Sequence, residues 1–125
     1  MKSLRYISVW IISFFTLINC TFVSAEEWPT APIRLIIPFA PGGGVDGAGR
    51  ILAQALEEKL KVSIIVDNKA GANGTIAMNF LRQSKPDGYT LSMVSTGALD
   101  VNMVLMTLPY DPAKDFTYIS SFIKF

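Results

Sequence analysis

Three consecutive glycines, Gly42 to Gly44, follow a short apolar run and precede a helical pattern in the stretch "IIPFAPGGGVDGAGR". Glycine has no Cβ and tolerates positive φ, so a ligand can come close to the backbone there. A helix that begins near Asp46 would add free N–H groups and partial positive charge. These features predict a site where main-chain N–H groups hold an anion. The same residues also suit a tight strand-to-helix turn without a ligand.

A second interpretation of this loop is a dinucleotide site. The stretch "GGGVDG", Gly42 to Gly47, fits the pattern G-x-G-x-x-G, and Asp67 follows about 20 residues later, as the Rossmann-type domain of an oxidoreductase requires. The export signal described below argues against this alternative, because it lacks the twin arginine that exports prefolded cofactor proteins. A Walker loop is excluded because no Gly-Lys-Ser/Thr follows the glycines.

The composition removes the usual catalytic and metal-binding residues. The chain has no histidine and one cysteine, Cys20. Transition-metal sites and Ser-His or Cys-His catalysis therefore lack their usual groups. Ser95 and Thr96 have no histidine to activate them as nucleophiles. We expect a binding protein and not an enzyme, with no cofactor and no metal.

The first 25 residues have the pattern of an export signal. Lys2 and Arg5 precede an apolar run, residues 7–18, that is shorter than the ~20 residues of a spanning helix, and "VSA" ends at Ala25. We expect cleavage after Ala25 and a soluble periplasmic product. A retained signal anchor and a lipoprotein acylated at Cys20 are the alternatives. Cleavage leaves nine basic and ten acidic residues, a formal charge of −1, so no basic surface suggests nucleic acid.

Strand and helix patterns alternate after the signal. Apolar runs predict strands over residues 33–37, 62–67 and 90–95. Helical spacing begins at Asp46, and further helices are predicted over residues 75–83 and 98–106. This order predicts an α/β fold with a parallel sheet and right-handed crossovers. The positions expected to face inward are Ala48, Ile51, Leu52, Ala55, Leu56 and Leu60 on the first helix and Ile76, Phe80 and Leu81 on the second.

The loops after the three strands should share one edge of the sheet. In open α/β sheets, ligands lie beyond the carboxyl ends of the strands. "AGANG" and "STGA" follow the second and third strands, so they would lie beside the glycines. Three small-residue loops on one edge favour a ligand site over three unrelated turns.

Five stretches resemble the periplasmic substrate-binding receptors of the tripartite tricarboxylate transporter family, the Bug-type receptors. The resemblance covers essentially everything from Trp28 to the end, and the set of stretches is specific although no single one is. The stretches are "WPTAPIRLIIPFAPGGGVD", "VDNKAGANGTIA", "KPDGYTLSM", "STGAL" and "LPYDPAKDFTYIS".

The resemblance implies that residues 26–125 are the incomplete first domain of a two-domain, type II periplasmic-binding-protein-like fold that closes on a small carboxylate. Main-chain N–H groups would hold the carboxylate. Gly71 and Gly74 would shape the intervening loop. The first wall would be Pro41, Gly42, Gly43, Gly44, Val45 and Asp46, and the second wall Ser95, Thr96, Gly97 and Ala98. For Asp46 itself, capping of the helix by its carboxylate is favoured over contact with the ligand.

The resemblance also implies partners and a longer chain. The partners would be a small organic carboxylate and the membrane components of the transporter, with a monomer expected for the complete receptor. Relatives continue beyond "DFTYISSFIKF" into a second domain and then return to the first. We therefore expect residues 26–125 alone to be marginally stable and to bind carboxylates weakly or not at all.

Overall fold

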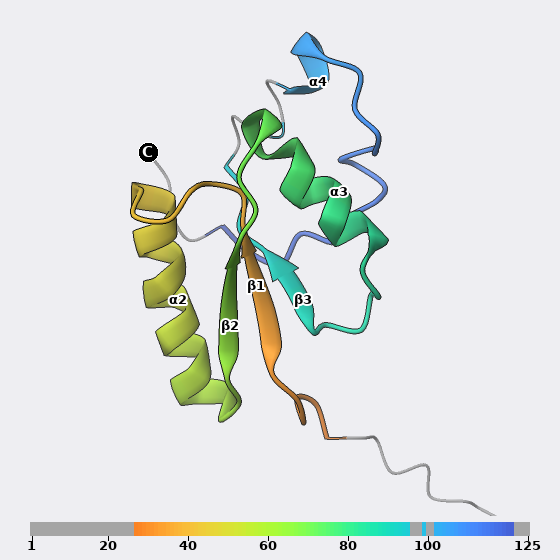
Figure 1. The fold of residues 1–125 in the computed structure, drawn as a ribbon. Helices are drawn as coiled ribbons and strands as arrows, with labels where there is room; N and C mark the ends of the chain where they lie inside the picture. Colours follow the sequence, from red (N-terminus) through yellow and green to blue (C-terminus); the bar gives the residue numbers. More distant parts are fainter. Residues whose placement is uncertain (1–26, 96–98, 100–101, 122–125) are drawn as a thin grey trace, which may run out of the picture.

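The structure is a computed structural model that describes residues 27–95, 99 and 102–121. It confirms the predicted α/β fold, with strands and helices alternating along the chain (Figure 1). The helix over Thr75–Gln83 has the predicted bounds. In chain order the elements are β1 (Ile33–Ile37), α2 (Gly44–Leu60), β2 (Ile64–Asn68), the 3₁₀ turn η1 (Ala72–Gly74), α3 (Thr75–Gln83), β3 (Thr90–Ser92) and α4 (Asn102–Leu105).

The three described strands form a parallel sheet, as the alternating pattern predicts. Their order in the sheet is β2-β1-β3. The first strand in the chain is therefore the central one. It pairs with β2 from Ile33 opposite Ile64 to Ile37 opposite Asn68, and Leu35 lies opposite Leu91 of β3. Helix α2 covers one face of the sheet and α3 the other (Figure 1). All three strands consequently point their carboxyl ends toward one edge.

The main core lies between α2 and the sheet. Ile33 and Leu35 of β1 are buried there with Ala53 of α2. The predicted inward face of α2 is wrong at Ile51, which is 73% exposed, and at Ala55, which is also exposed. Helix α2 is rotated so that its small residues contact the sheet, and Ile51 then lies about 200° around the helix from the buried Gly49.

A second core lies between α3 and the segment that follows β3. Met78 is buried there with Leu99 and Tyr110, and the Tyr110 ring packs edge-on against Phe116 at 5.4 Å between centroids. The segment after β3 thus packs against α3. The inward prediction for Ile76 is wrong, because its side chain is 53% exposed. The buried positions of α3 are Ala77 and Met78 instead.

Strand β3 is shorter than predicted, and the last predicted helix is described only in part. Strand β3 ends at Ser92, three residues before the predicted end. Helix α4 spans Asn102–Leu105, and residues 98, 100 and 101 of the predicted helix lie outside the described residues. Within the described part of the chain, every helix lacks the length or the apolar character that spanning a bilayer requires.

Hydrogen bonds between the amide side chain of Asn102 and Asn73 attach α4 to the loop before α3. Asn102 is 1% exposed. Its Oδ1 accepts from Asn73 Nδ2 at 2.8 Å, and its Nδ2 donates to the Asn73 carbonyl at 3.0 Å. Asn73 holds φ 50 and ψ 40, a conformation that asparagine tolerates better than most residues. The reciprocal bonds hold η1 and α4 together.

Asn102→Ala is expected to lower the free energy of unfolding by about 1 to 2 kcal/mol, because it removes both hydrogen bonds that the buried Asn102 side chain makes to Asn73. Urea unfolding followed by circular dichroism would measure the change. Met103→Ala is the matched control, because Met103 is adjacent and 54% exposed. Equal unfolding midpoints for the two variants would contradict the structural role of the pair.

Candidate functional site

The topology creates a crevice position between the ends of β1 and β3. After β1 the chain continues into α2 on one face of the sheet. After β3, Leu99 packs against Met78 of α3 on the other face. Ligands of open α/β sheets bind at such switch points, outside the carboxyl ends of the strands. The glycine loop, residues 38–43, lies at this position between β1 and α2.

The three glycines have different backbone roles. Gly42 has φ +87, which favours glycine. Gly43 is the N-cap of α2 with φ −80 and ψ 169, which any residue can adopt, and Gly44 is the first helical residue. A Cβ on Gly44 would meet nothing within 4 Å, and one on Gly43 only the Ala40 carbonyl oxygen at 3.8 Å. Gly43 and Gly44 therefore keep open the space before the helix.

The start of α2 supplies the donors. The N–H groups of the first turn, from Gly43 to Asp46, have no carbonyl one turn earlier within the helix. The helix dipole adds partial positive charge at the same point. An anion approaching over Gly43 and Gly44 would meet N–H groups without an intervening side chain.

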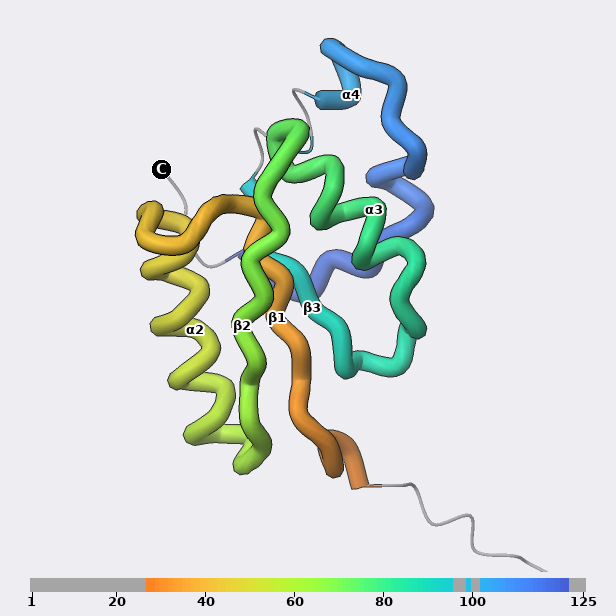
Figure 2. The backbone as a smooth tube through the Cα atoms, viewed as in Figure 1, coloured from red at the N-terminus to blue at the C-terminus, as the bar shows by residue number. Residues whose placement is uncertain are grey.

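Hydrogen bonds to the Asp46 carboxylate fix the geometry of the glycine loop. Its side chain is buried, and its Oδ2 accepts the Gly42 N–H at 2.9 Å and Arg50 Nε at 3.0 Å. Its Oδ1 accepts Asn68 Nδ2 at 2.9 Å. Asn68 Nδ2 also donates to the Phe39 carbonyl at 2.9 Å. Figure 2 shows the loop after β1 beside the end of β2, where Asn68 lies.

The capping role predicted for Asp46 needs correction, whereas its contact with a ligand stays a prediction. No side chain caps the N-cap position of α2, and the N–H that Asp46 accepts belongs to Gly42, which precedes the helix. In a capping box the side chain at this third helical position bonds the N–H of the N-cap residue, whereas Asp46 reaches one residue further back, to Gly42. Both oxygens accept donors of the protein, so the carboxylate supports the loop. Because the Gly42 N–H already donates to Asp46, it is not available to a ligand.

A profile of the family described as "Tripartite tricarboxylate transporter family receptor" matches residues 48–125 of this chain. The chain belongs to this family. Among the curated relatives, the receptor chain is 41% identical to protein BugT of Bordetella pertussis over 100 residues, which are 78% of this chain and 31% of BugT.

Two solved structures of Rhodopseudomonas palustris proteins resemble the receptor chain. MatC with bound malate is 33% identical with a TM-score of 0.68, covering 72% of this chain and 31% of MatC. Rpa4515 with adipate is 35% identical with a TM-score of 0.55, covering 57% of this chain and 24% of Rpa4515. The receptor chain thus spans less than a third of the length of BugT, MatC and Rpa4515.

The other predicted wall residues of the receptor chain are placed as follows. Pro41 is exposed, and the Val45 side chain packs against the main core, so Val45 can offer a ligand only its main chain. The Ser95 carbonyl accepts the Leu99 N–H at 3.2 Å. Thr96, Gly97 and Ala98 lie outside the described residues. In the intervening loop, Gly71 and Gly74 have φ +133 and +90.

Sequence reasoning missed the support that Arg50 and Asn68 give to the candidate site through Asp46. Asp46 and Arg50 are four residues apart on a helix, and this spacing is the signal that could have indicated their ion pair. For Asn68 the only signal was its position directly after the predicted strand over residues 62–67. Its partners lie 22 and 29 residues away, beyond the reach of any local pattern.

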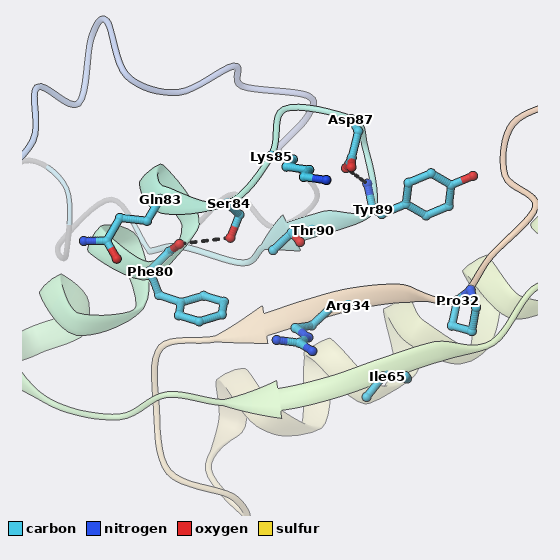
Figure 3. Close-up of a pocket in the computed structure, with 10 residues that line it drawn as sticks. All are labelled: Pro32, Arg34, Ile65, Phe80, Gln83, Ser84, Lys85, Asp87, Tyr89 and Thr90. Atoms are coloured by element: carbon cyan, nitrogen blue, oxygen red, sulfur yellow. Dashed lines mark hydrogen bonds between the residues drawn. The ribbon is translucent and has the colours of Figure 1, made fainter.

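A pocket of about 440 Å³ lies at the opposite end of the receptor's sheet (Figure 3). Its lining includes Arg34 and Thr90 near the amino ends of β1 and β3, and Phe80 of α3. The Arg34 guanidinium lies over the Phe80 ring at 5.9 Å. Because ligands of open α/β sheets bind at the carboxyl ends, the glycine loop and not this pocket is the candidate site.

The acid sensitivity of the receptor chain should reflect Asp46. The Arg50 side chain, the Gly42 N–H and the Asn68 amide, in this order, lower the pKa of Asp46 from 3.8 to about 2, against the opposing effect of burial. A depressed pKa adds stability that is complete above pH 3.8 and is lost as the pH falls through about 2.

Asp46→Asn should therefore flatten the fall of the melting temperature between about pH 4 and pH 2, measured by circular dichroism. Part of the fall should remain, because hydrogen bonds from Lys114 and the Ala113 N–H also lower the pKa of Asp111. Identical acid slopes for the variant and the natural chain would show that Asp46 does not couple to folding.

Proposed function

We propose that this chain is the first lobe of a periplasmic solute-binding receptor for a small organic carboxylate. The observation that supports this most is the arrangement at the switch point, where the unpaired N–H groups of α2 face a space that Gly43 and Gly44 leave free of side chains. A carboxylate is one of the anions that such a set of N–H donors recognises without a cationic side chain. Residues 95–98, after β3, form the opposite wall in this proposal.

Several features of the whole receptor also belong to the proposal. Residues 1–25 are removed as a signal peptide, residues 26–125 act in the periplasm, and the bound acid is passed to the membrane components of a tripartite tricarboxylate transporter. Malate in MatC and adipate in Rpa4515 support a di- or tricarboxylate as the ligand class. The function proposed is binding and not catalysis.

The dinucleotide alternative is less well supported. A dinucleotide-binding half of the Rossmann type has the strand order 3-2-1, with the third strand beside the second. Here β3 lies beside β1, in the order β2-β1-β3. Asp67, which would contact a ribose, has Lys69 at 3.3 Å and Arg34 at 4.0 Å instead.

Titration with malate, adipate and NAD, followed by the backbone amide signals in NMR spectra, tests the proposal. We expect malate or adipate to shift the N–H signals of Gly43, Gly44 and Val45. The Gly42 signal should shift less, because its N–H already bonds to Asp46. A single lobe excludes little water, so saturation should require millimolar acid.

The diamide of malic acid is the matched control, because it has the shape of malate without its charge. Shifts at the same three N–H groups with the diamide would mean that the charge is not recognised. A response to NAD alone would overturn the receptor proposal in favour of the dinucleotide alternative.

A further inference from the structure

We infer that Asn68 is a positioning residue of the carboxylate site, which it supports without touching the ligand. This inference rests on the proposed function. Asn68 is the last residue of β2 and lies opposite Ile37, the last residue of β1. It is thus placed at the carboxyl edge of the sheet, next to the point where the glycine loop begins.

The side-chain nitrogen of Asn68 bonds to residues on both sides of the three glycines. Asn68 Nδ2 donates to the Phe39 carbonyl, two residues after β1, and to Asp46 Oδ1, in the first turn of α2, each at 2.9 Å. The loop from residue 39 to residue 46 is therefore closed across a single side chain. The Lys69 N–H donates to the Ile37 carbonyl at 2.8 Å, so β2 is itself fixed to β1 at this point.

The chemistry of the position favours an amide. Two acceptors meet Asn68 Nδ2, while its Oδ1 accepts Arg50 Nη2 at 3.4 Å. An aspartate here could not donate when ionised and would repel Asp46. An alanine would leave the Phe39 carbonyl and Asp46 Oδ1 each short of one donor. Asparagine has the two N–H bonds and the single acceptor that this arrangement uses.

Asn68 influences the ligand site through its bond to Asp46, which in turn holds Gly42. Asp46 Oδ2 holds the Gly42 N–H at 2.9 Å, and Gly42 directly precedes the N–H groups that we assign to the ligand. If Asn68 releases Asp46 and Phe39, the loop can turn these N–H groups away from a common point. Sites of this kind lose function with small errors in donor position.

Asn68→Ala in the full chain is expected to weaken malate binding about tenfold, because Asp46 loses a charge-assisted bond. In the ligand-free chain, hydrogen exchange at the Gly42 N–H should become faster. Ser84→Ala is the matched control: it removes one side-chain bond to a carbonyl, Ser84 Oγ to Phe80 at 3.0 Å, far from the site. The control should change neither quantity.

Asn68→Asp provides a second test if the alanine variant folds poorly. The charged groups around the new carboxyl group are Asp46 and Arg50 of α2, with Asp67 and Lys69 beside it in the chain. At pH 7.5 repulsion from Asp46 should open the loop. At pH 5, a proton held between the two carboxyl groups restores a donor, so malate affinity relative to the natural chain should recover.

The outcomes separate this inference from the proposed function. Unchanged Gly42 exchange and unchanged malate affinity in Asn68→Ala, or a pH-independent affinity ratio in Asn68→Asp, would overturn the role of Asn68. If the natural chain shows no response to any acid, the proposed function fails, and the Gly42 exchange rates still decide whether Asn68 holds the loop.

Discussion

Gly49→Val should lower the free energy of unfolding by about 2 to 3 kcal/mol, a large share of the stability of a small domain. Gly49 lies where α2 crosses closest to the sheet. A Cβ there would collide with Ile37 Cδ1 and come within 2.9 Å of Met93 Sδ. Both neighbours are buried core residues, so they can move only by disturbing other contacts. Valine adds two further methyl groups at the same point.

Gly47→Ala in the same helix is the matched control for Gly49→Val. A Cβ on Gly47 meets nothing within 4 Å, so alanine should stabilise the chain by about 0.5 to 1 kcal/mol through its higher helix propensity. Chemical denaturation of both variants measures the contrast. Similar effects of the two substitutions would show that α2 does not approach the sheet as closely as described.

Gly43→Val should abolish carboxylate binding while leaving the fold in place. The backbone of Gly43 is extended, and a Cβ has room beside the Ala40 carbonyl, so the cost to folding should stay below about 1 kcal/mol. The branched side chain would occupy the approach to the N–H groups of α2. The malate titration described above, together with a thermal melt, separates the two effects.

Gly42→Ala should have the opposite effects: it should lower the stability of the fold and leave carboxylate binding in place. Alanine at φ +87 is strained, which should cost about 1 to 2 kcal/mol of stability, although a Cβ there meets nothing within 4 Å. Binding survival in Gly43→Val would mean that the glycine loop is only a turn. Equal stability losses in the two variants would contradict the distinct backbone roles of the glycines.

Local patterns carried the prediction of the elements. The apolar run of β1 and the spacing of α3 gave their bounds because such patterns depend on near neighbours. The rotation of α2 did not follow, because apolar residues at Ile51 and Ala55 fit the same periodicity, whereas the close approach at Gly49 is a property of the packed sheet.

The glycine loop could be predicted as a site from residue types, but its support could not. Gly42 and its neighbours indicate close approach of a ligand through their chemistry alone. The role of Asp46 depends on Asn68, which the fold brings across from β2. The pairing of Asn73 with Asn102 is of the same kind, since the two residues lie 29 positions apart. Contacts of this range have no local sequence signal.

The central position of the first strand determines when this chain can fold. Ile33 pairs with Ile64, 31 residues later, and Leu35 with Leu91, 56 residues later. A chain that emerges from its amino end therefore exposes β1 well before either neighbour is present. Among the described strands, β2 is the first partner that becomes available to β1, and β3 can pair with the other side of β1 only later. The glycine loop and Asn68 belong to the part that can assemble first, so the support of the site can form before the sheet is complete.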